Sequence, residues 1–225
     1  MAENTGTVMS HMALHYRGGD YERARLLLED LGCTLVDNGP PAAKGFCTAL
    51  LDDARDDCAD NLLFLSEIDA AQLGLERALL ELLGDGTEAP HPALTSFLDR
   101  RHAQAEAIAH LGIRYGTFEQ LEAVLTRLER DTQPGAPLAG RVEIFKRIPA
   151  PGHSQSVDDR IAASPVFTGD EPAGPAKHWV QCRIVTDVLG FGIVSLGSEF
   201  ELDFVFDDWF AAPASFTPAA DPRRG

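Results

Sequence analysis

The stretch His11-Met-Ala-Leu-His-Tyr16 places its larger apolar side chains at every second position, which predicts a strand. A tight turn at Arg17-Gly-Gly19 follows, and Asp20 then stands where the N-cap of a helix is expected. Apolar residues next recur at the i, i+3, i+4, i+7 spacing of one helix face, namely Ala24, Leu27, Leu28 and Leu31. We expect this helix to end at Gly32.

The same pattern occurs a second time, from His110 onward. His110-Leu-Gly-Ile-Arg-Tyr115 again alternates, and Thr117 with Gln120 forms a capping-box signature after a shorter turn. The helix that follows carries its apolar face at Leu121, Val124, Leu125 and Leu128. Both copies therefore predict a strand, a turn and an amphipathic helix, which indicates a duplicated module.

Strand-like runs complete each copy. In the first copy they cover residues 33–37, 46–51 and 62–68; in the second they cover 141–148, 179–188, 193–196 and 200–206. A strand, one helix and several further strands favour an α+β fold in which the helix covers one face of a mixed sheet. We predict two βαβββ modules in tandem, at residues 1–69 and 107–210.

The remaining segments are predicted to support these modules. Residues 70–106 read as a helical connector, because 70–83 and 92–105 both have helical character. Residues 149–176 are rich in Pro, Gly, Ser and Asp, which predicts a long loop, either a mobile lid or plain disorder. The tail 211–225 is expected to be disordered.

Composition narrows the classes of function. A formal charge of −16 opposes binding to nucleic acid, and the absence of a signal peptide or a long apolar run opposes secretion and membrane insertion. The four cysteines lack metal or redox spacing, so we expect reduced core or surface thiols in a cytoplasmic protein. No P-loop, GxGxxG or GxSxG motif is present.

Several stretches resemble the vicinal-oxygen-chelate superfamily. They are Ser10-His11-Met-Ala-Leu with Leu28-Glu-Asp-Leu31-Gly32, Ala109-His110-Leu-Gly-Ile-Arg114, the strand pair from Trp179 through Gly197, and Phe200-Glu201-Leu202. The resemblance implies that the two modules pair into a cupped β-sheet half-barrel with the helices outside. The superfamily includes glyoxalase I, methylmalonyl-CoA epimerase, extradiol dioxygenases, fosfomycin-inactivating transferases and metal-free proteins that sequester bleomycin-type drugs. It therefore implies the fold more strongly than the chemistry.

Strand alternation predicts which side chains face the cup. If Leu111, Ile113 and Tyr115 pack under the helix, His110, Gly112 and Arg114 face the opposite side. By the same argument His11, Ala13 and His15 face that side in the first module, as do Glu201 and Asp203 on the last strand.

The resemblance implies a site for one divalent metal ion. His11, His110 and Glu201 are its expected ligands, and Fe, Mn, Ni, Co or Zn would suit this set. Glu201 is also the expected catalytic carboxylate, with Asp203 as an alternative. Glyoxalase-like members often supply a fourth ligand from the first module, where this sequence has Phe64, or Leu63 if the register slips by one. A three-ligand site, as in the dioxygenases, remains open.

The expected substrate-binding residues are Arg114, His15, Gln181, Arg183 and Phe64. The polar ones would hold a carboxylate or carbonyl group unless they face solvent instead. The leading interpretation is a metal-dependent enzyme that acts on a small oxygenated molecule. The alternatives are a metal-free protein that sequesters a drug or metabolite, which the aromatic residues Phe46, Phe64 and Trp179 favour, and a non-catalytic regulatory protein. Either a monomer or a homodimer is compatible with the sequence.

Overall fold

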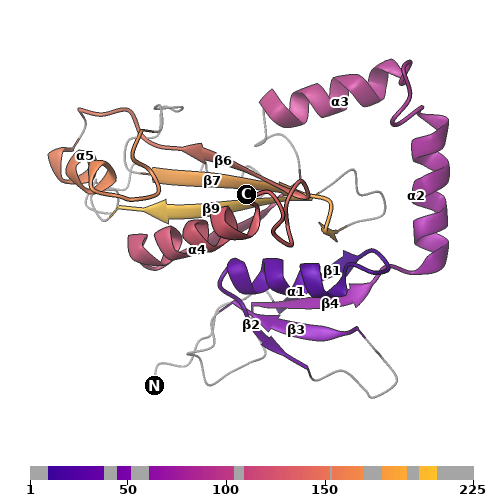
Figure 1. Cartoon of the computed structure of the whole chain (residues 1–225), viewed down its shortest axis with the longest axis horizontal. Helices are drawn as coiled ribbons and strands as arrows, with labels where there is room; N and C mark the ends of the chain where they lie inside the picture. The colour runs from indigo at the N-terminus through magenta and orange to yellow at the C-terminus, as the bar shows by residue number, and fades with distance from the viewer. Residues whose placement is uncertain are drawn as a thin grey trace, which may run out of the picture.

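The first half of the chain forms a mixed sheet with one helix across it (Figure 1). A computed structural model describes residues 10–37, 45–51, 61–103, 109–152, 154–169, 179–191 and 198–206. The elements of the first half are β1 (His11–Tyr16), α1 (Tyr21–Asp30), β2 (Thr34–Val36), β3 (Cys47–Leu50) and β4 (Leu62–Glu67). Each predicted strand of this half is confirmed to within two residues at either end.

The second half repeats this order with two additions. Its elements are β5 (Leu111–Arg114), α4 (Phe118–Asp131), β6 (Val142–Arg147), α5 (Gln155–Ala162), β7 (Trp179–Thr186), β8 (Leu189–Gly190) and β9 (Ser198–Val205). His110 lies directly before β5 rather than inside it. The predicted capping box at Thr117 and Gln120 is present, with each side chain bonded to the backbone of the other residue.

The two halves share one sheet topology. The first sheet has the order β2-β3-β4-β1-β8, and the second has the order β5-β9-β7-β6. In each half the first strand pairs in parallel with the last, and the other pairs within that half are antiparallel. Two mixed sheets with helices confirm the α+β class, and the described strands form no closed barrel.

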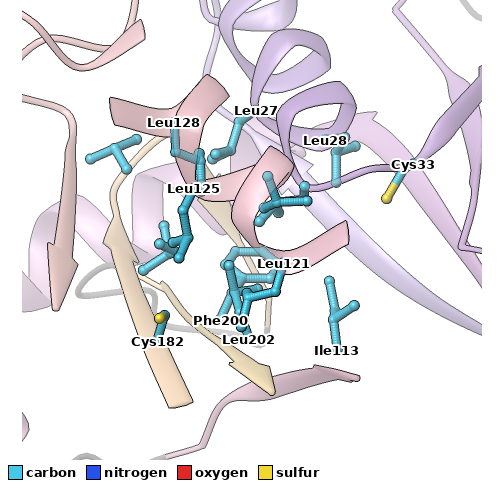
Figure 2. Packing of buried hydrophobic residues seen from close by; sticks show 14 of the residues in the cluster. Leu27, Leu28, Cys33, Ile113, Leu121, Leu125, Leu128, Cys182, Phe200 and Leu202 are labelled. Atoms are coloured by element: carbon cyan, nitrogen blue, oxygen red, sulfur yellow. The ribbon is translucent and has the colours of Figure 1, made fainter. Parts of the chain in front are cut away.

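One apolar core joins the two halves. Helices α1 and α4 lie side by side and each packs its apolar face toward a sheet (Figures 1 and 2). The core includes Leu27 and Leu28 of α1, Leu121, Leu125 and Leu128 of α4, and Phe200 and Leu202 of β9. These are the residues that the helical and strand periodicities mark as apolar, so the sequence pattern and the packing agree.

Three of the four cysteines are described, and each is buried with a free thiol: Cys33, Cys47 and Cys182. Burial raises the pKa of the Cys33 thiol to about 12, so this group stays protonated at neutral pH. This agrees with the expectation of reduced thiols. Cys58 lies outside the described residues.

Two helices connect the halves, as expected: α2 (Ala70–Leu82) and α3 (Pro92–Ala103). Asp69 caps α2 by accepting hydrogen bonds from the backbone N–H groups of Ala71 and Gln72. None of the helices in the described part of the chain is long and apolar enough to cross a bilayer.

The loop predicted for 149–176 was partly wrong, because this segment contains helix α5. Val157 and Ile161 are buried at i, i+4 spacing, and Arg160 pairs with Glu119 and Glu122 of α4. Farther along, the buried Phe167 stacks on Phe118, with ring centroids 5.5 Å apart. The prediction failed because the segment is rich in Pro, Gly and Asp and its helical apolar pattern has only two buried members. Packing against α4 stabilises this short helix. Residues 170–176, the strand predicted for 193–196 and the tail 211–225 lie outside the described residues.

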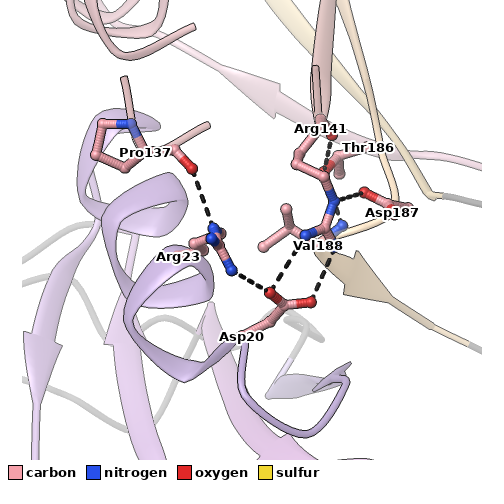
Figure 3. A network of polar contacts seen from close by, with 7 residues as sticks. All are labelled: Asp20, Arg23, Pro137, Arg141, Thr186, Asp187 and Val188. Carbon is pink, nitrogen blue, oxygen red and sulfur yellow. Dashed lines mark hydrogen bonds and ion pairs between the residues drawn. The ribbon is translucent and has the colours of Figure 1, made fainter. Parts of the chain in front are cut away.

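Asp20 joins the two halves instead of capping α1 through its side chain. No side-chain capping bond forms there; the Asp20 carboxylate accepts hydrogen bonds from Arg23 and from Arg141 of the second half (Figure 3). Arg141 also binds Asp187, at 2.7 Å from its Nε. These arginine contacts hold the pKa of Asp20 below its ordinary value, with the hydrogen bond from Arg141 as the largest cause. The side chain of Asp20, predicted to cap α1, thus connects the two halves through Arg141.

A second polar contact between the halves involves two carboxyl groups. Asp30, at the end of α1, is only 2 % exposed and faces Asp131, Arg127 and Arg130 of α4. Burial and the neighbouring Asp131 raise the pKa of Asp30 to about 7, although the two arginines act in the opposite direction. The carboxyl group of Asp30 is therefore partly protonated near neutral pH.

We predict that Asp30→Asn stabilises the protein at alkaline pH. Since the pKa of Asp30 is raised on folding, its contribution is complete below the unfolded pKa and is lost as the pH rises through about 7. The wild-type protein should lose on the order of 2 kcal/mol between about pH 5 and about pH 8, and the variant should lose less. Urea denaturation at several pH values measures this. Asp99→Asn, at an exposed position of α3, is the matched control and should follow the wild type.

Candidate functional site

Each sheet has one face toward the helical core and one face away from it. Along β5, Leu111 and Ile113 are buried while Gly112 and Arg114 are exposed. Along β1, Leu14 and Tyr16 are buried, whereas His11 and Ala13 are exposed. The face that strand alternation assigns to the candidate residues is thus the face away from the helices.

His110 and Glu201 form the central contact of the second sheet. The distance from His110 Nε2 to Glu201 Oε2 is 3.6 Å, and Glu201 is only 8 % exposed. Glu201 reaches this place because β9 pairs in parallel with β5, which sets Glu201 opposite Gly112, two residues after His110. The parallel register therefore determines which carboxylate meets this imidazole.

The environment of Glu201 disfavours its charged form. Burial is the largest cause of its raised pKa, and the neighbouring Asp203 adds to it. His110 and a hydrogen bond with Gln181 act in the opposite direction. A buried carboxyl group whose pKa is raised is a common feature of functional sites.

Glu201 is the middle member of a row of carboxylates along β9. Glu199, Glu201 and Asp203 occupy alternate positions and so point to the same face of the sheet. Asp203 accepts a hydrogen bond from Trp179 Nε1 at 3.1 Å. Beside it, Gln181 pairs with Asp203 across the strands and accepts a hydrogen bond from Arg147 at 3.2 Å. The row therefore places three carboxyl groups side by side on this face.

Arg183 supports this row and is not available to a ligand. Its Nε lies 2.7 Å from Glu199 Oε1, and its Nη2 donates to the backbone oxygen of Arg101 in α3. Both side chains of this ion pair are buried, and Glu199 is only 1 % exposed. The expected substrate-binding role of Arg183 is therefore replaced by a structural role, which holds α3 against the sheet.

The first half has an aromatic pair at the matching place. Phe64 pairs with Ala13, two residues after His11, as Glu201 pairs with Gly112, two residues after His110. His11 and Phe64 have ring centroids 4.6 Å apart. Phe64, and not Leu63, therefore occupies the position equivalent to Glu201. A third ring, Phe46, lies 5.7 Å from Phe64.

His15 lies at a different junction. Its Nδ1 is 3.3 Å from Ser66 Oγ, and it lines a cavity together with Gln72 and the buried Glu76 of α2. At about 10 Å³ this cavity has room for one water molecule and none for a substrate. Glu76 and His15 thus belong to the packing of α2 against β1.

The structure brings His110, Glu201 and Gln181 together on one face. The contact of His11 with these residues stays a prediction. Within the described part of the chain, no group of three or more His, Cys, Asp or Glu side chains lies close enough to hold a metal ion. His110 and Glu201 suit two positions of one ion, because ligand atoms about 2.1 Å from a tetrahedral zinc lie roughly 3.4 Å from each other.

Sequence reasoning missed two neighbours of this site, Glu199 and Arg147. Glu199 was detectable, because it continues the alternation of Glu201 and Asp203 toward the start of the strand. Arg147 was not, since its place beside Gln181 depends on the register of β6 with β7. Comparison with models of known protein families, with curated proteins and with solved structures found no match to this chain.

We predict that removing one member of the Arg183–Glu199 ion pair destabilises the protein more than removing both members. Glu199→Gln should destabilise the protein by about 3 kcal/mol, because it leaves a buried guanidinium without its counter-charge. The double variant Arg183→Met with Glu199→Leu should recover most of this loss, because it removes both charges. Urea denaturation of the single and double variants measures the coupling. Equal losses in the single and double variants would contradict it.

Proposed function

We propose that this chain is a vicinal-oxygen-chelate type protein and that His110 and Glu201 bind a divalent metal ion at which a small oxygenated molecule reacts. The observation that supports this most directly is the 3.6 Å contact between His110 Nε2 and Glu201 Oε2. The duplicated strand order and the duplicated register of the first and last strands agree with the proposal. The proposal takes the two sheets as the two modules, with α1 and α4 between them rather than outside one cupped sheet.

The ligand set suits several metals. One imidazole nitrogen and one carboxylate oxygen accommodate Fe(II), Mn(II), Ni(II), Co(II) or Zn(II), and His11 is the proposed third ligand. When bound, such an ion supplies Lewis acidity and a template for two adjacent oxygens of a substrate. Phe64 leaves the fourth position of a glyoxalase-like set without a donor, so a three-ligand site is the version we propose.

The protein's own groups have separate tasks in this proposal. Glu201 is the proposed catalytic carboxylate, because a raised pKa makes its anionic form a better proton acceptor. Asp203, which accepts a hydrogen bond from Trp179, is a second carboxyl group next to it. Gln181, fixed by Arg147, offers its amide N–H groups to Glu201 or to a substrate oxygen.

A second candidate function is metal-free binding of an apolar or aromatic molecule. The stack of His11 on Phe64, with Phe46 beside it, favours this function, because aromatic faces bind flat ligands through large contact areas. It predicts thermal stabilisation by such a ligand in the presence of a chelator. Stabilisation that a chelator abolishes would support the metal-dependent function instead.

We predict that metal binding depends on His110 and Glu201. Equilibrium dialysis against Mn²⁺, Ni²⁺ or Zn²⁺ should give an affinity that falls more than about tenfold in His110→Gln and in Glu201→Gln. His91→Gln, at an exposed position before α3, is the matched control and should bind as the wild type does. Loss in His11→Gln would support a three-ligand site, whereas unchanged binding in Glu201→Gln would rule out the proposed one.

We also predict that Phe64→Glu strengthens metal binding. This variant places a carboxylate at the position that the register equates with Glu201, and so it adds a donor from the first half. The affinity should rise about tenfold or more in the same dialysis. Phe64→Gln replaces the ring by a neutral donor and so measures the effect of losing the ring. Phe46→Glu measures the effect of a carboxylate at a neighbouring position. Equal gains in Phe64→Glu and Phe46→Glu would show that charge alone acts.

A further inference from the structure

Helix α2 presents an apolar face to solvent at one edge of the molecule (Figure 1). Leu82 is 80 % exposed and Leu75 is 49 % exposed, which are the highest values among the large apolar side chains that the structure describes. The exposed residues Ala71 and Ala78 lie on the same face, because these four positions follow the alternating spacing of four and three residues that is typical of helix pairing. The face therefore runs along almost the whole of this 13-residue helix.

The inward side of α2 is apolar as well. Leu73 and Leu80 on that side are half-buried, and Glu76 is only 1 % exposed and accepts a hydrogen bond from Gln72 at 3.2 Å. At about 100° per residue, the exposed face is centred roughly 130° around the helix axis from Glu76. Apolar side chains on both sides are typical of a helix that is covered on both sides. One side of α2 packs within the chain, and the other lacks a cover among the described residues.

Small residues allow a second helix to approach this face closely. Ala78 lies at its centre and Gly74 borders it, and both are exposed. The space beside Gly74 is open, since a Cβ atom added there would meet nothing within 4 Å. Helices that meet through small side chains pack with their axes about 8 Å apart, at the short end of the usual range. The face therefore suits close contact with another helix.

The charges beside this face favour a second copy of the same chain as its partner. Arg77 and Glu81 are exposed and lie four residues apart, so they share one flank of the face. A two-fold axis midway between Leu75 and Leu82 makes the two helices antiparallel and sets Leu75 opposite the partner's Leu82. The same axis brings Arg77 within the rise of one residue, about 1.5 Å, of the position opposite the partner's Glu81. Because the contact is symmetric, it forms two such ion pairs.

We propose that two copies of this chain associate through α2, with the apolar faces in antiparallel contact and with Arg77 paired to the partner's Glu81. A helix of 13 residues is about 20 Å long, so this contact alone is smaller than the interface of a permanent dimer. We expect a reversible dimer whose Kd is on the order of 10–100 µM. The contact uses neither His110 nor Glu201, and it is therefore independent of the function proposed above.

Sedimentation velocity of the full chain at concentrations from about 5 to about 500 µM tests this proposal. Arg77→Glu should weaken self-association about tenfold or more, as should Glu81→Arg, because each single variant sets like charges against each other. An equimolar mixture of the two variants should associate as the wild type does, because each copy then meets the opposite charge at both ion pairs. Recovery in the mixture requires a contact between copies, since no effect within one chain produces it.

Asp99→Arg, at an exposed position of α3, is the matched control. It makes the same change of charge as Glu81→Arg and should leave association unchanged. Far-UV circular dichroism verifies that each variant keeps its helices. The proposal is overturned if the wild type stays monomeric up to about 500 µM, or if neither charge variant weakens association. It is also overturned if the mixture associates no better than the single variants, or if Asp99→Arg has the effect of Glu81→Arg.

Discussion

Parallel pairing of the first strand with the last strand of each half is the constraint on which this structure depends. Parallel neighbours cannot be joined by a hairpin, so the chain must cross over, and each crossover begins with a helix, α1 in the first half and α4 in the second. Each helix covers one face of its sheet, and the two helices share one core (Figure 2). The opposite face of each sheet then holds the polar and aromatic residues with no helix from its own crossover above them.

The same register gives the two halves different chemistry. A histidine at the start of the first strand meets a residue of the last strand that is Glu201 in one half and Phe64 in the other. The result is an acid–imidazole contact at 3.6 Å in the second half and a ring stack at 4.6 Å in the first. A duplicated fold has thus kept its geometry and changed its side chains, which is how a shared scaffold acquires an asymmetric site.

The sequence predicted the strands, the main helices and the faces of β1, β5 and β9, because these follow from periods of 2 and 3.6 residues. It did not predict that Asp20 would bind Arg141, or that Arg183 would form a buried ion pair with Glu199, since both contacts depend on how distant segments pack. It also missed α5, whose few apolar residues are spread among Pro, Gly and Asp. Which candidate residues meet depends on strand register: the parallel pairing of β9 with β5 sets Glu201 opposite Gly112, two residues after His110, and alternation alone does not give this.

Three carboxyl groups lie side by side on the face of β9 that points away from α4. The central claim is that His110 and Glu201 bind a metal ion there, and anomalous X-ray diffraction from crystals soaked in Mn²⁺ or Zn²⁺ tests it most directly. We predict an anomalous peak within coordination distance of His110 Nε2 and a Glu201 carboxylate oxygen. A fully occupied peak elsewhere, or none at these two residues, would contradict it.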